Sequence, residues 1–190
     1  MQKANNTITS NKKGFTLIEV LVVVAMIVAL TALGGSGFAA LSHARANKVV
    51  KSIDTLLSQS KVNALSGKEN TLEIFYNENE DRDNGYKSKT YYGVLKDRNG
   101  NIYETEELGN SLVTINCSNG GDVGKNACIK AKFNTKTGKI EYCCVKNPNA
   151  SVSAEEISNT PNKITIYASF GSTYAVEIFK LTGEHHVVGQ

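Results

Sequence analysis

Residues 12–33 read KKGFTLIEVLVVVAMIVALTAL, two lysines and a glycine followed by a run that is apolar except for two threonines and Glu19. At about 1.5 Å per residue, a helix over residues 15–33 is roughly 29 Å long, close to the thickness of the hydrocarbon core of a bilayer. We therefore predict that residues 15–33 form a single membrane-spanning helix.

The charge distribution predicts the orientation of that helix. The chain has 190 residues with 21 Lys+Arg and 18 Asp+Glu, a formal charge of +3. Residues 1–14 hold three lysines and no acid, which leaves 18 bases against 18 acids in residues 15–190. No base follows the apolar run until Arg45, so the positive-inside rule places residues 1–14 in the cytoplasm and the rest outside. A composition of 41% hydrophobic and 21% charged residues excludes a disordered chain and a multi-span membrane protein.

Two ordinary interpretations compete for the apolar run. A plain signal anchor needs no acid in its core, and a cleaved secretory signal has a shorter run ending in small residues, which Ala32 and Gly34 could supply. Neither explains Glu19, because an ionised side chain within a membrane segment costs about 2.5 to 3.5 kcal/mol on insertion scales. Glu19 is therefore a candidate functional residue.

The sequence KKGFTLIE at residues 12–19, followed by the apolar run, resembles the class III signal peptide of type IV prepilins and type II secretion pseudopilins. The resemblance implies that prepilin peptidase, a membrane aspartyl protease, cuts between Gly14 and Phe15 and that Phe15 is then N-methylated. The resemblance further implies that Glu19 becomes the fifth mature residue and pairs with the new amino group of a neighbouring subunit during assembly. The implied partners are prepilin peptidase, other pilin or pseudopilin subunits, membrane lipid before assembly and an inner-membrane assembly platform.

The chemistry of these residues agrees with that role. Glycine before the cut lets the backbone extend into a protease without a side chain in the way. Glu19 lies four residues after Phe15, about one helical turn from the cut. A carboxylate in apolar surroundings needs a cation, and cleavage creates one at the amino group of Phe15.

The next segment predicts a second helical stretch. Residues 34–38 read GGSGF, and each glycine costs roughly 1 kcal/mol relative to alanine in a helix. This segment is either a linker at the membrane boundary or a part of the helix that bends during assembly. Apolar residues spaced by three and four then predict an amphipathic helix to about Leu65, ended by Gly67. The expected organisation is a leader at 1–14, a membrane helix at 15–33, a glycine break and stalk helix at 34–66, and an exported head at 67–190.

The head has the pattern of β-strands separated by short turns. The predicted strands cover residues 71–76, 91–96, 102–104, 112–116, 129–133, 139–144, 163–170, 173–181 and 185–188. Close spacing predicts an antiparallel sheet, so the fold class is α+β, a long N-terminal helix on an antiparallel head, as in type IV pilins. The phrases F-x-x-x-x-G-x-I at residues 133–140 and IFKLTG at 178–183 resemble the GspH/FimT group of minor pseudopilins. Another minor pilin or a major pilin remains an alternative.

Four cysteines follow in the exported part: Cys117, Cys128, Cys143 and Cys144. Disulfides can form outside the cytoplasm, and four cysteines allow three connectivities. If residues 128–133 pair with 139–144, Cys128 comes opposite Cys143 or Cys144, and Cys117 is left for the other. Free thiols are the alternative, and zinc is disfavoured because no C-x-x-C occurs.

No metal, cofactor or catalytic residue is predicted. The acidic run at residues 77–85 does not fit the spacing of a calcium-binding EF-hand, so a solvated hairpin loop is expected. His185 and His186 would point to opposite faces of a strand and are interpreted as surface residues. His43 lies on the predicted stalk helix, away from both, and no G-x-S-x-G motif is present.

The predicted function is that of a non-enzymatic structural subunit, a minor one, of a type IV pilus or type II secretion pseudopilus. The alternatives are a DNA-uptake pseudopilin, a major pilin and an anchored envelope protein that does not polymerise. Some FimT-like relatives contact DNA through basic residues near the C-terminus. The corresponding stretch here, residues 184–186, reads EHH and lacks that charge, which argues against nucleic acid as a partner.

Overall fold

The computed structural model describes residues 15–81, 84–110, 112–117, 121–123, 128–146, 163–168, 173–179 and 182–189. The chain divides into two compact units, Met1–Phe38 and Ala39–Gln190, and each is described by itself.

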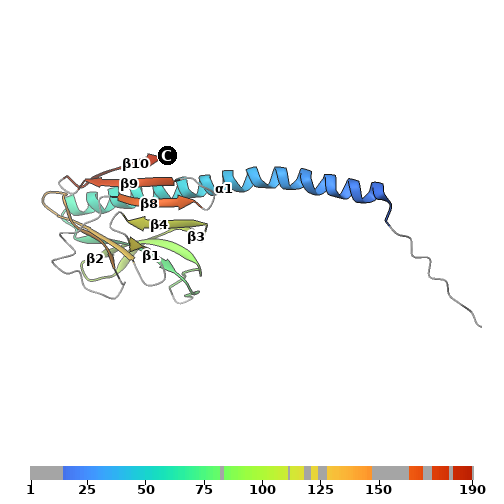
Figure 1. Ribbon diagram of the computed structural model, residues 1–190. Coiled ribbons are helices and arrows are strands. Elements are labelled where there is room, and N and C mark those ends of the chain that lie inside the picture. The colour runs from blue at the N-terminus through green and yellow to red at the C-terminus, as the bar shows by residue number, and fades with distance from the viewer. Residues whose placement is uncertain are drawn as a thin grey trace, which may run out of the picture. The chain divides into compact units, whose positions relative to one another are not determined.

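The N-terminal element is helix α1, Leu17–Leu65, which contributes to both units (Figure 1). Its backbone is helical through Gly34, Gly35 and Gly37, which fits the alternative of a continuing helix and not that of a linker. Three glycines cost helix stability, but good helix formers flank them on both sides and no proline is present, so local propensity does not end the helix. Among the described residues, no helix combines the length and hydropathy that define a membrane-crossing candidate.

The end of α1 was predicted correctly. Gly67 has a φ of 84°, in the left-handed region that glycine adopts without strain. The Gly67 N–H donates to the Ala64 carbonyl at 2.8 Å and the Lys68 N–H to the Asn63 carbonyl at 3.0 Å. This pair of bonds is a Schellman cap, which satisfies carbonyls that the last turn would otherwise leave open.

The described residues of the second unit form two five-stranded antiparallel sheets. The first sheet has the order β3 (Ile102–Asn110), β2 (Thr90–Asp97), β1 (Asn70–Asn77), β6 (Cys128–Phe133) and β7 (Ile140–Lys146). The second sheet has the order β10 (Glu184–Gly189), β9 (Thr173–Phe179), β8 (Lys163–Ala168), β4 (Val113–Cys117) and β5 (Gly121–Asp122). The α+β class with antiparallel strands is confirmed and is consistent with the pilin fold, but the head has two sheets where one was expected.

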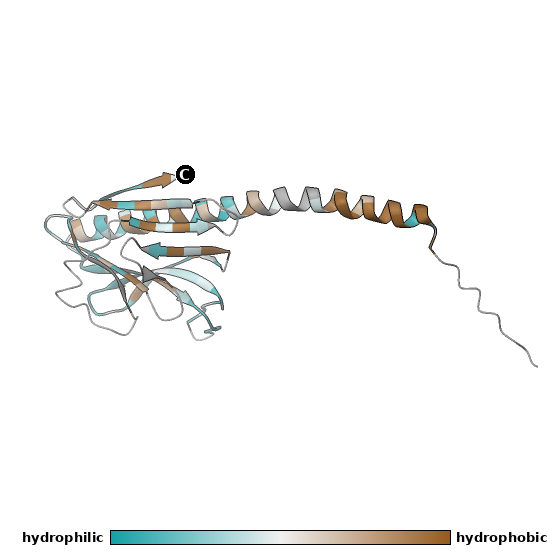
Figure 2. Cartoon of the chain, viewed as in Figure 1, coloured by the Kyte–Doolittle hydropathy of each residue, from teal (hydrophilic) through white to brown (hydrophobic). Residues whose placement is uncertain are grey.

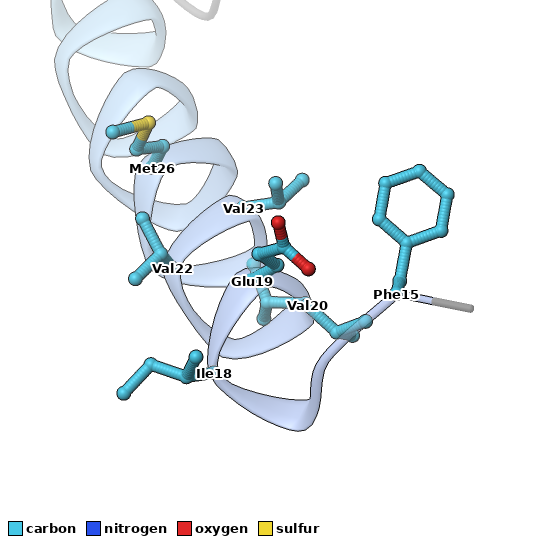
Figure 3. Close-up of a pocket in the computed structure, with 8 residues that line it drawn as sticks. Phe15, Ile18, Glu19, Val20, Val22, Val23 and Met26 are labelled. Atoms are coloured by element: carbon cyan, nitrogen blue, oxygen red, sulfur yellow. The ribbon is translucent and has the colours of Figure 1, made fainter. Parts of the chain in front are cut away.

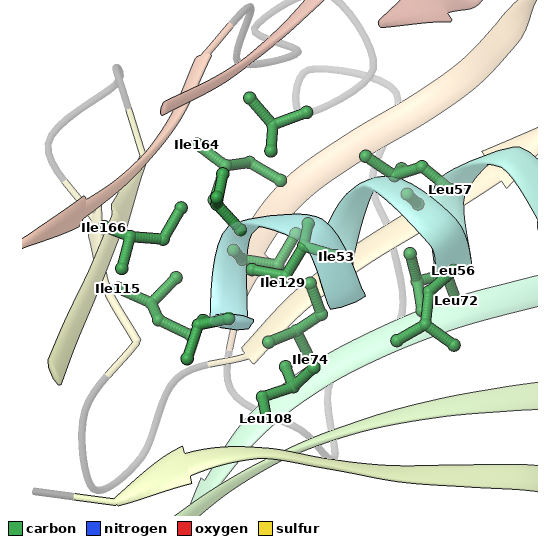
Figure 4. Close-up of a cluster of buried hydrophobic side chains, with 14 of the residues drawn as sticks. Ile53, Leu56, Leu57, Leu72, Ile74, Leu108, Ile115, Ile129, Ile164 and Ile166 are labelled. Carbon is green, nitrogen blue, oxygen red and sulfur yellow. The ribbon is translucent and has the colours of Figure 1, made fainter. Parts of the chain in front are cut away.

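The part of α1 within the second unit lies in the core between these sheets. Its inward side chains are at most 1% exposed and are Ala46, Val49, Val50, Ile53, Leu56, Leu57 and Ala64. Figure 4 shows Ile53, Leu56 and Leu57 from α1 among isoleucines and leucines from both sheets. The predicted apolar face of the stalk helix is therefore the centre of the head.

Polar contacts fix how α1 meets the strands. Ser60 Oγ donates to Asn70 Oδ1 at 2.5 Å, and Asn70 Nδ2 donates back to the Ser60 carbonyl at 3.0 Å. Both residues are buried, so these bonds satisfy groups that would otherwise be costly to exclude from water. They hold the start of β1 against the last turns of α1.

Candidate processing and assembly site

The site predicted from the sequence lies at the start of α1. Phe15 and Thr16 precede the first helical residue, Leu17. Thr16 N–H donates to Glu19 Oε2 at 2.7 Å, and Thr16 Oγ1 donates to the same oxygen at 2.8 Å. The Glu19 N–H in turn approaches Thr16 Oγ1 at 3.3 Å. Thr16 is therefore the N-cap of the helix and Glu19 its third residue, the reciprocal arrangement called a capping box.

The capping box gives Glu19 a second role, stabilising the start of α1, which was not predicted from the sequence. The signal was present, since Ser or Thr followed three residues later by Glu or Gln before an apolar run marks a helix start. Two donors that the first turn would leave unsatisfied are bonded by this pair. Oε2 accepts both bonds, and no described residue bonds Oε1. One carboxylate oxygen is thus available to a further donor.

The surroundings of Glu19 are apolar and open. Glu19 is the only Asp, Glu, Lys or Arg among residues 15–44. The large side chains around it are exposed, with Phe15 at 87%, Leu17 at 83% and Val20 at 54%. Figure 2 shows the hydrophobic colouring concentrated at this end of α1. A shallow hollow runs along the helix beside Glu19, lined by valines, Ile18, Phe15 and Met26 (Figure 3). Such an uncovered apolar face indicates a surface that another molecule covers.

The predicted cut between Gly14 and Phe15 is only partly described. Residues 1–14, including Gly14, lie outside the described residues. On the other side of the cut, Phe15 and Thr16 are not helical. The predicted cut therefore lies before the first helical residue, Leu17.

Residues 9–34 match the family model described as the prokaryotic N-terminal methylation motif. This chain carries the N-terminal motif of type IV prepilins and pseudopilins. The motif implies processing by prepilin peptidase and assembly with other pilin subunits, and it is a motif of structural proteins, not of an enzyme family. No curated protein and no solved structure matches the chain. The assignment of the GspH/FimT group therefore stays a prediction.

The register expected for Cys128 was wrong. Cys128 lies opposite Lys146, whereas Ala131 and Lys130 lie opposite Cys143 and Cys144. The reason is a longer hairpin connection: β7 begins at Ile140, and the register shifts between Lys132 and Phe133. The side chains of Cys117, Cys143 and Cys144 lie outside the described part of the chain, so disulfide formation stays a prediction.

The thiol of Cys128 belongs to a buried polar cluster. It is fully buried, and its Sγ donates to Glu73 Oε1 at 3.4 Å. Glu73 is 4% exposed and also pairs with Lys96, and with Lys130 Nζ at 3.7 Å. A buried carboxylate is tolerated only when it is paired, and two lysines and a thiol meet that need.

His185 and His186 lie on opposite faces of β10, as predicted. His185, however, is not a surface residue. Its side chain is 6% exposed, and its Nε2 lies 3.1 Å from the Asp54 carbonyl and 3.0 Å from Ser58 Oγ. His186 is half exposed and stacks on Phe179. His43 contacts the Tyr174 hydroxyl. His185 thus attaches the last strand to α1.

The described residues of the acidic run at 77–85 lie at the end of β1 and in the connection from β1 to β2. Asp81 and Tyr86 form a backbone bridge, and Asp81 accepts from the side chain of Asn84 at 2.9 Å. Arg82 and Asp83 lie outside the described residues. No group of three or more His, Cys, Asp or Glu side chains suited to a metal occurs within the described ranges.

Proposed function

We propose that this protein is a subunit of a type IV pilus or type II secretion pseudopilus, cut between Gly14 and Phe15 and assembled through the start of α1. The single observation that carries the proposal is the capping box, a carboxylate with a vacant oxygen at the start of an exposed apolar helix, within the matched motif. Membrane lipid covers the apolar face before assembly, and neighbouring helices cover it afterwards. The leader remains cytoplasmic and the head is exported.

Glu19 can serve the subunit twice. Within its own chain, Oε2 caps the helix through Thr16. During assembly, Oε1 accepts a hydrogen bond from the charged amino group of Phe15 in a neighbouring subunit. An ion pair between two such groups is strong only where water is excluded, which is the environment that packed apolar helices provide.

Two finer proposals concern which filament system the subunit serves and whether it is a minor or a major subunit. The two sequence phrases at residues 133–140 and 178–183 favour a minor subunit of the GspH/FimT kind over a major pilin. The described C-terminal strand β10 contains Glu184, His185 and His186, and His185 is turned inward onto α1. This strand offers no cluster of bases for nucleic acid, so we favour a pilus or secretion role over DNA uptake.

The test is a comparison of Glu19→Gln with Glu19→Ala. Glutamine can still complete a capping box because its amide oxygen accepts the Thr16 N–H, but it carries no charge. We expect both variants to be cut at Gly14 normally and both to be lost from sheared filaments. Processing is measured by mass spectrometry of the mature N-terminus and assembly by immunoblotting of the filament fraction.

A matched control separates capping from charge. Thr16→Val removes the capping hydroxyl and keeps the carboxylate, so we expect it to assemble better than Glu19→Gln. Normal assembly of Glu19→Gln with loss of Glu19→Ala would reduce the role of Glu19 to helix capping. Normal assembly of both Glu19 variants would refute the proposed role of the carboxylate.

A further inference from the structure

Three bases form a row on one side of α1 in the second unit. Arg45, Lys48 and Lys51 follow one another at intervals of three residues, which places them along one side of the helix. Lys48 and Lys51 are exposed and Arg45 is half-buried. We call this row the basic ridge. None of its side chains forms an ion pair or a hydrogen bond with a residue that the structure describes.

Two carboxylates beside the basic ridge are engaged elsewhere. Glu106 accepts a hydrogen bond from Ser52, the residue that follows Lys51 in α1. Glu107 lines a hollow next to the ridge but pairs with Lys87, with 2.7 Å between Nζ and Oε2. The basic ridge therefore keeps positive charge that the described residues around it do not neutralise. This charge is available to an anion on another molecule.

The surface around Lys48 is shaped and equipped for a phosphate group. One shallow hollow, of about 240 Å³, lies between α1 and the edge strand β3. The other, of about 420 Å³, lies along α1 and brings the side chain of Asn47 beside Lys48 and Lys51. The Asn47 amide is bonded to no residue in the described part of the chain. Ammonium groups and amide N–H groups are donors, and phosphate oxygens are strong acceptors for both.

The place of the basic ridge in the chain indicates where the phosphates come from. Residues 15–44 contain no base, and Glu19 is their only acid. A helix of these 30 residues is about 45 Å long, and a bilayer with its headgroups is about 40 to 45 Å thick. A chain that enters the membrane at Phe15 therefore has its first exported base, Arg45, at the depth of the outer headgroups.

The whole ridge is short enough to act at that surface. Arg45 and Lys51 are six residues apart, or about 9 Å along a helix. This is close to the Debye length of about 8 to 10 Å at physiological salt, so all three bases lie within the field of an anionic surface. Their long side chains can also extend toward the phosphates. Each base near such a surface strengthens binding by about five-fold.

We propose that the basic ridge binds the headgroups of anionic phospholipids at the outer surface of the membrane that holds α1 before assembly. The inference rests on the proposed function, because it requires a chain that α1 anchors in a membrane. The anchor keeps the ridge beside lipid phosphates at a high effective concentration, an advantage that a free polyanion such as nucleic acid lacks. The contact holds the head at the membrane surface and is broken when the subunit enters a filament.

The experiment uses the full-length, uncut chain in nanodiscs that contain equal amounts of phosphatidylglycerol and phosphatidylcholine. A photo-crosslinking amino acid replaces Ala44, which is exposed and lines the larger hollow with Lys48. Mass spectrometry of the labelled peptide counts adducts of the two lipids. We expect phosphatidylglycerol adducts to exceed phosphatidylcholine adducts by at least about five-fold. Equal numbers of the two adducts would overturn the proposal.

Charge removal tests whether the ridge causes the preference. A triple variant with Arg45→Gln, Lys48→Gln and Lys51→Gln should bring the ratio of the two adducts close to one. The matched control removes the same charge from three exposed bases in the turns that follow α1 and β6, by changing to glutamine Lys68, Lys136 and Lys139. This control should keep the preference of the parent. Equal loss in both triple variants would show a general attraction of the head and would overturn the ridge as the binding site.

Salt and competitors test the chemistry without any substitution in the ridge. In 1 M salt the Debye length falls to about 3 Å, so the preference for phosphatidylglycerol should largely disappear. Inorganic phosphate or a DNA duplex, added at the concentration of phosphate groups that the lipid supplies, should leave the preference in place. Loss of the preference to either competitor, or a preference that 1 M salt does not change, contradicts the proposal.

A crosslinker at Val22, within the apolar run, separates two failures. We expect it to label both lipids without preference, because it lies among acyl chains. Labelling at Val22 with equal adducts at Ala44 overturns the ridge contact alone. No lipid adduct at Val22 overturns the membrane anchorage on which the proposed function rests, and the ridge contact with it.

Discussion

Gly183→Ala should destabilise the head strongly because two independent costs meet at that position. Gly183 lies in the turn between β9 and β10 with a φ of 63°, in the left-handed region. A Cβ atom there would lie 2.1 Å from the Gly138 carbonyl oxygen and 3.2 Å from Phe133 Cε1. The first neighbour is backbone and cannot move aside by changing a rotamer.

The two costs can be estimated separately. An alanine in the left-handed region costs about 1 to 2 kcal/mol. Forcing an extra carbon into a packed site costs typically 1 to 3 kcal/mol. The sum is about 2 to 5 kcal/mol, a large part of the roughly 5 to 15 kcal/mol that stabilises a domain.

Gly67→Ala is the matched control. Gly67 has a φ of 84°, but nothing lies within 4 Å of a Cβ added there. It should therefore carry the conformational cost of about 1 to 2 kcal/mol alone. The free energy of unfolding is measured by urea titration of the full-length protein in detergent, followed by tyrosine fluorescence. Equal costs for Gly67→Ala and Gly183→Ala would refute the packing of the β9–β10 turn on Gly138.

Two further predictions concern the helix and a hairpin turn. Ile53→Ala should lower the free energy of unfolding by about 2 to 5 kcal/mol because Ile53 is fully buried. Val62→Ala, at a position 63% exposed, should change it by no more than about 0.5 kcal/mol. Similar losses for the two variants would contradict the described core. Hydrogen bonds from the Asn101 side chain and backbone lower the pKa of Asp97, so the charged carboxylate stabilises the fold above its unfolded pKa, and this contribution is lost as pH falls. Asp97→Asn should therefore be less stable than the parent at neutral pH and approach it below about pH 4; a gap that does not narrow on acidification would contradict this.

Short sequence patterns predicted those features of the fold that are decided by residues close together in the chain. The spacing of Val49, Ile53 and Leu56 indicated which face of the helix is buried, and Gly67 marked its end. The close spacing of the predicted strands 91–96 and 102–104 indicated the β2–β3 turn, in which Asp97 accepts hydrogen bonds from the backbone N–H groups of Asn99 and Asn101. In each case the residues that decide the structure lie within about two helical turns of one another along the chain.

Long-range pairing could not be predicted in the same way. Strand β4 pairs with β8, about fifty residues later, so the division into two sheets has no signal within either strand. The position of Cys128 depends on a register shift near Phe133, which one residue of loop length can alter. His185 is buried because β10 lies on α1, a contact between the end of the chain and a helix far earlier in sequence.

The capping box at the start of α1 is a different case. Its sequence signal is local, and yet it was not predicted. Thr16 and Glu19 have the spacing of a capping box, yet Glu19 was interpreted only through its cost in apolar surroundings and its pairing with a neighbouring subunit. The structure adds that the same carboxylate caps its own helix. Variants at Glu19 must therefore separate the two roles, as Glu19→Gln and Glu19→Ala do.

The mature N-terminus, determined by mass spectrometry of the protein from cells that contain a prepilin peptidase, tests the central claim most directly. Cleavage between Gly14 and Phe15 predicts a chain that begins with N-methylated phenylalanine. A chain that keeps Met1 would indicate an ordinary membrane anchor, and one that begins at Gly35 a secreted protein. Either of these results would contradict the account.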